Sequence, residues 1–65
     1  MITVNGKAFP GADGVCLSAF LDQAGYEPSR VAVELNGEIM PRAAYDTTLL
    51  GDGDQMEIVC FVGGG

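Results

Sequence analysis

Apolar and polar residues alternate in three parts of the chain, as they do in strands with one buried face. The three segments are residues 2–4, 31–35 and 55–62. Each is short, and each is bounded by residues that favour turns, such as glycine, asparagine and proline. The pattern therefore predicts three strands spread from one end of the chain to the other.

Two Asn-Gly pairs follow the first two of these strands, at Asn5-Gly6 and Asn36-Gly37. This pair is the strongest short signal for a tight hairpin, because both residues tolerate a positive φ. We therefore expect a return strand after each turn, over residues 7–9 and 38–40. Pro41 ends the second return strand, since proline cannot donate to a sheet.

Helical spacing replaces alternation between the two predicted hairpins. The apolar residues at i, i+3, i+4 and i+7 are Leu17, Phe20, Leu21 and Ala24. Gly25 is expected to end this helix. Asp13 is the expected N-terminal cap by residue type, with Cys16 as the alternative close to the boundary. Later in the chain, 42–50 is predicted as a short helical turn or loop held by Tyr45, Leu49 and Leu50.

The predicted order is strand, strand, helix, strand, short strand, loop and strand. A single helix covers only one face of a sheet, so the other face stays open. The expected fold is α+β: a β-grasp, or ubiquitin-like, domain with a mixed sheet of four or five strands packed on one helix. We expect this domain to span residues 1–62, with residues 63–65 as a flexible glycine tail.

The last strand carries the candidate binding residues. Its inward residues are predicted to be Met56, Ile58 and Cys60, by the period of two. Val59 and Phe61 then point outward with Glu57. Scattered apolar residues are common on protein surfaces, but these two lie just before the tail. We therefore predict that Val59 and Phe61 form a docking patch on the open face.

Composition limits the possible activities. The chain has 65 residues, with nine acidic and three basic side chains and a formal charge of −6. A small domain has a thin core, and an acidic one does not suit nucleic acid, which needs clustered Lys and Arg. The charge either favours a positively charged partner or only maintains solubility. We expect the protein to be a monomer when it is not bound to a partner.

The side chains offer little catalytic chemistry. Histidine is absent, Cys16 and Cys60 do not form a zinc motif, and no serine has a glycine-flanked elbow. We therefore predict no catalytic residue, no metal site and no bound cofactor, and we expect both cysteines to be buried free thiols. There is no leader and no apolar run long enough for a membrane span, so we expect a cytoplasmic protein that does not bind membranes.

Three consecutive glycines, Gly63, Gly64 and Gly65, follow the last strand. Fully extended they span about 10 Å, so they form a thread that can enter a narrow channel. A terminal fray or a cloning linker is the alternative. A carboxylate at the end of such a thread must be activated, for example by adenylation, before sulfide can attack it. The chain has no Walker loop, so a partner must supply that activity.

The sequence resembles the ThiS family of sulfur carriers in thiamine biosynthesis. The resemblance rests on four segments: the first strand with Asn5-Gly6, the run from Val33 to Arg42, the turn Asp52-Gly53-Asp54 with the strand after it, and the end from Phe61 to Gly65. It implies that a ThiF-like adenylyltransferase uses MgATP to adenylate Gly65 and that a thiocarboxylate then forms there. It also implies that a ThiG-like thiazole synthase takes the sulfur, and that Gly64 and Gly65 are the functional pair, extended by Gly63.

Three other functions fit the same features. The small subunit of molybdopterin synthase has this fold and a thiocarboxylate end. A ubiquitin-like modifier would form isopeptide bonds with lysines. A binding module with an inert tail belongs to a different class. In each case the chain itself is not an enzyme.

Overall fold

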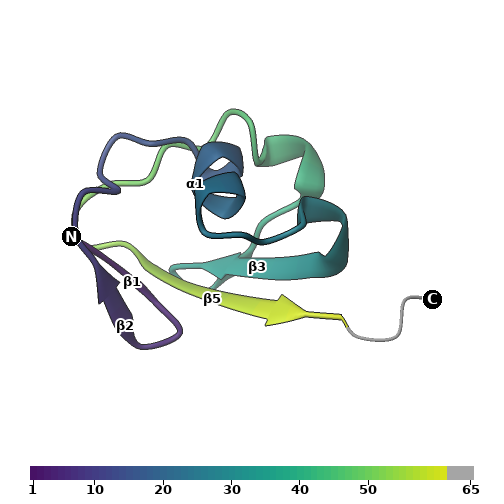
Figure 1. The fold of residues 1–65 in the computed structure, drawn as a ribbon, viewed down its shortest axis with the longest axis horizontal. Coiled ribbons are helices and arrows are strands. Elements are labelled where there is room, and N and C mark those ends of the chain that lie inside the picture. The colour runs from purple at the N-terminus through teal and green to yellow at the C-terminus, as the bar shows by residue number, and fades with distance from the viewer. Residues whose placement is uncertain (62–65) are drawn as a thin grey trace.

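The structure is a computed structural model that describes residues 1–61. Its elements in chain order are β1 (Ile2–Val4), β2 (Lys7–Phe9), α1 (Leu17–Gln23), the 3-10 turn η1 (Pro28–Arg30), β3 (Val31–Leu35), β4 (Glu38–Ile39), the 3-10 turn η2 (Arg42–Ala44) and β5 (Gln55–Cys60). The strands form one sheet in the order β2-β1-β5-β3-β4. β1 pairs with β5 in parallel, and the other three pairings are antiparallel. Figure 1 shows α1 over one face of this mixed sheet, which is the predicted β-grasp.

Both predicted hairpins are confirmed. Asn5 and Gly6 have φ values of 50° and 83°, and Asn36 and Gly37 have 51° and 85°. Two successive residues with positive φ form the tight turn whose twist matches that of the flanking strands. β4 is one residue shorter than expected and ends at Ile39 instead of residue 40.

The helix α1 is shorter than the apolar stripe predicted. Leu17, Phe20 and Leu21 are buried as expected. Ala24 is exposed, which corrects its predicted place in the core, because the helix has already ended at Gln23. The cap position is taken by Cys16 and not by Asp13, and the Cys16 side chain makes no capping hydrogen bond.

Gly25 ends the helix as predicted. Its φ of 86° places it in the left-handed region that glycine enters without steric cost. Its N–H donates to the carbonyl of Asp22 at 3.2 Å, and the Tyr26 N–H donates to the carbonyl of Leu21 at 2.8 Å. These two bonds satisfy carbonyls that the end of the helix leaves free.

The core lies between α1 and the covered face of the sheet. Its buried residues are Ile2, Val4, Ala12, Leu17, Phe20, Leu21, Val31, Val33, Tyr45, Leu50, Met56 and Ile58. Leu49 was expected among them but is 68 % exposed. The backbone around Leu49 runs beside residues 15–17, where the Leu50 N–H donates to the Val15 carbonyl at 2.9 Å. In this extended segment alternate side chains point in opposite directions, so Leu50 enters the core and Leu49 faces solvent.

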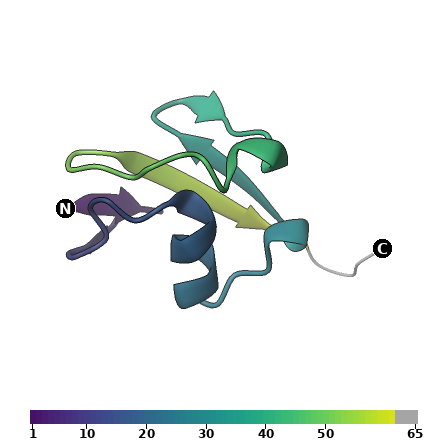
Figure 2. The same cartoon turned by 90° about the horizontal axis from the view of Figure 1, so that it is seen from above.

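Cys60 was also expected in the core, and that prediction is wrong: Cys60 is exposed. It pairs with Val31 on β3. On the other side of β5, the pairing with β1 stops at Met56. Cys60 therefore has the predicted direction but no neighbouring strand on one side to bury it. Figure 2 shows this end of β5 beside the turn that contains η1.

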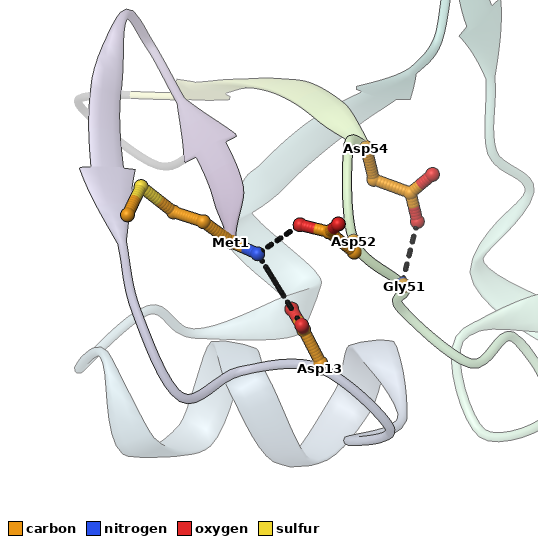
Figure 3. A network of polar contacts seen from close by, with 5 residues as sticks. All are labelled: Met1, Asp13, Gly51, Asp52 and Asp54. Carbon is orange, nitrogen blue, oxygen red and sulfur yellow. Dashed lines mark hydrogen bonds and ion pairs between the residues drawn. The ribbon is translucent and has the colours of Figure 1, made fainter.

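The start of the chain is held against the turn before β5 (Figure 3). The Met1 ammonium lies 3.2 Å from Oδ1 of Asp13 and also pairs with Asp52. The Gly53 N–H donates to the Met1 carbonyl at 2.9 Å. The turn itself is closed by Asp54, whose Oδ2 accepts the Gly51 N–H at 2.8 Å. Asp13 therefore binds the amino terminus and not the helix.

Candidate functional site

The face of the sheet opposite α1 carries the predicted docking residues. Val59 is 59 % exposed and Phe61 is 57 % exposed, whereas Met56 and Ile58 at the alternate positions are buried, so the outward direction is confirmed by the period of two. Val59 pairs with Ala32 on β3. The Phe61 N–H donates to the carbonyl of Arg30 at 2.8 Å, so the backbone of β5 stays bonded to the chain before β3 one residue beyond the strand. We call Val59 and Phe61 the apolar patch; its binding role stays a prediction.

Two carboxylates lie beside the apolar patch on the same face. Glu34 of β3 is directly opposite Glu57 of β5 in the antiparallel register. Both ion pairs found within residues 1–61 involve the Met1 ammonium, so no basic group in this part of the chain neutralises either glutamate. Like charges in directly opposite positions repel one another. This pair was not predicted, since sequence periodicity gives the direction of each glutamate but not the register that joins them.

A hollow of about 480 Å³ lies next to this pair. Glu34 and Glu57 contribute to its wall, with Thr3 and Gln55. The glycines of both hairpin turns complete its rim. The hollow is therefore a polar, acidic recess on the open face, which suits a cationic side chain better than an apolar one.

Both hairpin asparagines hold β5 in place through their side chains. The Asn5 carboxamide bonds the N–H and the carbonyl of Ile58, at 2.9 and 3.1 Å. The Asn36 Oδ1 accepts the Gln55 N–H at 2.9 Å, and its Nδ2 donates to Asp54 at 2.9 Å. The strand that carries the apolar patch is thus fixed from both neighbouring hairpins, a role that the Asn-Gly signal does not reveal.

The two cysteines are free but are not buried as predicted. Cys16 is half-buried, and its Sγ lies 3.3 Å from the Ser18 hydroxyl. The hydrogen bond from Ser18, followed by one from the Ala19 backbone, lowers the pKa of the Cys16 thiol. Cys60 is exposed near the end of β5.

The remaining predicted site residues, Gly63, Gly64 and Gly65, lie outside the described residues. Within residues 1–61, no three His, Cys, Asp or Glu side chains are grouped closely enough to hold a metal ion. In the same part of the chain, no helix is long and apolar enough to cross a membrane.

The family model described as the ThiS family matches residues 2–65 of the chain. This chain belongs to the ThiS family. A solved ThiS family structure, the thiamine biosynthesis protein ThiS from Geobacter metallireducens, is 40 % identical in sequence with a TM-score of 0.79. The alignment covers 98 % of this chain and 97 % of that protein. The match therefore extends to the whole β-grasp.

Longer relatives contain a segment similar to this ThiS family chain. A thiazole synthase of Paramagnetospirillum magneticum is 38 % identical over 64 residues, which are 98 % of this chain and 20 % of that protein. The chain thus spans one fifth of the length of this relative.

A second relative has nearly the same length as this chain. An uncharacterized protein, ycf40, of Pyropia yezoensis is 36 % identical over 64 residues, which are 98 % of this chain and 90 % of that protein.

Proposed function

We propose that this chain is a sulfur carrier in thiamine biosynthesis and that the carboxylate of Gly65 carries the sulfur. The observation that supports this most strongly is the match to the ThiS family, which includes the glycines at 63–65. Within residues 1–61 the side chains do not assemble a metal cluster, and the whole chain has no histidine. The chain is therefore proposed as a co-substrate of its partner enzymes and not as an enzyme.

The link to thiazole formation rests on the thiazole synthase relative. In that protein a segment 38 % identical to this chain is joined covalently to a much longer polypeptide. Covalent joining raises the effective concentration of two modules that work together. We therefore propose a thiazole synthase as the partner that receives the sulfur.

The proposed reaction begins with a ThiF-like adenylyltransferase and MgATP. A carboxylate oxygen of Gly65 attacks the α-phosphate of ATP, and pyrophosphate leaves. A sulfide-level sulfur then attacks the acyl carbon, and AMP leaves with the former carboxylate oxygen. The product is a thiocarboxylate on Gly65, and Gly64 and Gly63 give it a backbone without side chains that fits a narrow channel.

The described domain supplies the binding surface in this proposal. The apolar patch of Val59 and Phe61 lies at the end of β5, immediately before the tail in sequence. The Glu34–Glu57 pair next to it presents uncompensated negative charge, which favours a partner with basic side chains around an apolar contact. Because Asn5 and Asn36 hydrogen-bond β5, the strand that precedes the tail in sequence is anchored to both hairpins.

Intact-mass spectrometry tests the proposal directly. The purified chain, ending at Gly65, is incubated with the adenylyltransferase of the same organism, MgATP and a sulfur donor. We expect a product heavier by the difference between one sulfur and one oxygen atom, with the change located at Gly65 by fragmentation. An unchanged mass, with an adenylyltransferase shown to be active, would contradict the carrier function.

Adding purified acceptor proteins separates this function from its competitors. We expect the thiocarboxylate to be consumed by thiazole synthase and not by the large subunit of molybdopterin synthase. Isopeptide conjugates that survive a denaturing gel would instead indicate a protein modifier. An adenylate that never exchanges oxygen for sulfur would also favour the protein modifier over the carrier.

A further inference from the structure

Two of the three basic residues of this acidic protein meet at the turn η1, which Phe61 contacts. The three are Lys7, Arg30 and Arg42. The Arg30 carbonyl accepts the N–H of Phe61, the last described residue. The Arg42 guanidinium donates to the carbonyl of Ser29, the neighbour of Arg30, at 3.4 Å. Figure 2 shows η1 beside the end of β5.

Both arginines are available to a partner. Arg30 and Arg42 are exposed, and neither guanidinium forms an ion pair within residues 1–61. Arginine is the side chain best suited to bind carboxylates in a bidentate manner. Within residues 1–61 the Arg42 guanidinium donates one hydrogen bond, to Ser29, and most of its five N–H donors remain available to a partner.

The length of the tail selects the groups that these arginines meet. Four residues, 62–65, separate Phe61 from the terminal carboxylate and can span at most about 14 Å. When the tail is extended into a channel, the arginines stay at the entrance and do not reach the nucleotide at its far end. The groups within their reach are therefore those on the rim of the channel and not the phosphates of ATP.

We propose that Arg30 and Arg42 form a basic collar that binds carboxylates at the channel entrance of the enzyme that adenylates the tail. The inference rests on the proposed sulfur-carrier function and adds a second contact of opposite sign to the acidic open face. The Glu34–Glu57 pair attracts basic groups, while the basic collar attracts acidic ones. Charges of opposite sign at two places define the orientation of the domain on its partner, so the tail enters in one direction.

Charge reversal with a matched control tests the basic collar. The variants Arg30→Glu, Arg42→Glu and Lys7→Glu each change the formal charge from −6 to −8. Lys7 lies on the edge strand β2, which β1 separates from β5. Stopped-flow measurements give the association rate constant of each full-length variant with the adenylyltransferase of the same organism. We expect the two arginine variants to associate about tenfold more slowly at low salt, and Lys7→Glu within about twofold of the unmodified chain.

Three further measurements separate binding from folding and from net charge. Arg30→Lys and Arg42→Lys keep the charge, so we expect them to retain most of the association rate. High salt should remove most of the difference between the arginine variants and the control. Thermal denaturation should give the same midpoint for Arg30→Glu as for the unmodified chain, because no hydrogen bond of the Arg30 side chain is found within residues 1–61.

The outcomes distinguish this inference from the function on which it rests. If the unmodified chain is adenylated but all three reversals slow association equally, only net charge matters and the basic collar is refuted. The basic collar is refuted as well if neither arginine reversal has an effect. If the unmodified chain is not adenylated at all, the proposed function fails first and the basic collar fails with it.

Discussion

The side-chain carboxamide of Asn5 hydrogen-bonds both backbone groups of Ile58, a residue 53 positions later in the chain. Its Oδ1 accepts the Ile58 N–H at 2.9 Å, and its Nδ2 donates to the Ile58 carbonyl at 3.1 Å. The regular pairing of β1 with β5 stops one step earlier, at Val4 and Met56. The side chain therefore acts as one more backbone unit of β1 and extends the parallel ladder toward the end of β5.

We predict that Asn5→Gly lowers the free energy of unfolding by about 1–3 kcal/mol, because two partly buried hydrogen bonds are lost. Glycine accepts the φ of 50° at this position more readily than asparagine does and also raises the conformational entropy of the unfolded chain, so the side-chain bonds are isolated by comparison with a second Asn→Gly change at the same φ. Urea denaturation measures it. Asn36→Gly is the matched control: Asn36 has nearly the same φ but exposed hydrogen bonds, and we expect a smaller effect. Equal stability of Asn5→Gly and the unmodified chain would show that the bonds to Ile58 contribute nothing.

Local sequence signals predicted the elements but not their second contacts. The Asn-Gly pairs predicted both hairpins, since turn conformation depends only on neighbouring residues. The bond from Asn5 to Ile58 depends on how strands from the two ends of the chain meet, which no local pattern encodes. The prediction of Asp13 as the helix cap is wrong for the same reason, because local sequence does not encode tertiary contacts. The carboxylate of Asp13 pairs instead with the Met1 ammonium.

Periodicity predicted directions in the candidate site better than it predicted burial. Val59 and Phe61 face solvent, as the period of two requires. Cys60 points to the opposite face and is nevertheless exposed. Its burial would also need β1 beside it, and the pairing of β1 with β5 ends at Met56. The pairing of Glu34 with Glu57 depends on the register of β3 and β5, and a single sequence does not give that register.

The Glu34–Glu57 pair leads to a prediction of opposite effects on stability and binding. Glu34→Gln removes one of two like charges in directly opposite positions, so we expect the free energy of unfolding to rise by a few tenths of a kcal/mol, to about 1 kcal/mol at most. Glu57→Gln should have a similar effect, and the double variant should add little, because the repulsion is already gone. Urea denaturation at low salt measures these differences. Glu38→Gln, which is opposite Leu35 on the edge strand, is the control and should change stability less.

The binding half of this prediction uses the same variants. If the pair attracts basic groups of the partner, Glu34→Gln should associate more slowly with the adenylyltransferase while being more stable. A variant that is stabilised and binds equally well would show that the repulsion is incidental to recognition.

The ion pairs of Met1 predict a stability plateau in the middle of the pH range. The hydrogen bond to Asp52 raises the pKa of the Met1 ammonium above its ordinary value of 8.0, with a further contribution from Asp13. Its stabilisation is therefore complete below about pH 8 and is lost as the pH rises through the raised pKa. The same bond lowers the pKa of Asp52 below 3.8, so that stabilisation is present above this pH and is lost as the pH falls through the lowered pKa.

Both groups are exposed to solvent, so the change at each end should be small. Thermal midpoints from pH 2 to pH 11 measure it in the unmodified chain and in Asp52→Asn. We expect the variant to have a weaker dependence above pH 8, since Asp13 alone then remains to hold the ammonium. An identical alkaline profile for both proteins would show that the Asp52 contact does not persist in solution.

The apolar patch predicts a difference between binding and folding. Val59→Asp and Phe61→Asp replace side chains that are more than half exposed, so we expect the free energy of unfolding to change by less than about 0.5 kcal/mol. Affinity for the adenylyltransferase should fall at least about tenfold, or 1.4 kcal/mol, because an apolar contact is replaced by a charge. Leu49→Asp is the control, since Leu49 is 68 % exposed but lies on the helix side of the sheet. If Leu49→Asp weakens binding as much, the effect comes from added charge and not from the patch.

Removing Gly64 and Gly65 separates the group that reacts from the surface that binds. The buried core is formed by residues between Ile2 and Ile58, and glycine has no side chain to pack, so we expect the truncated chain to keep its thermal midpoint. It should still bind the adenylyltransferase, because Val59, Phe61 and the Glu34–Glu57 pair are intact, and therefore it should inhibit activation of the full-length chain. Intact-mass spectrometry should detect no sulfur on the truncated chain. Inhibition without sulfur uptake is the signature of a docking domain whose reactive group is the terminal carboxylate; a truncated chain that gains sulfur would place the reactive group elsewhere, with exposed Cys60 the first residue to examine.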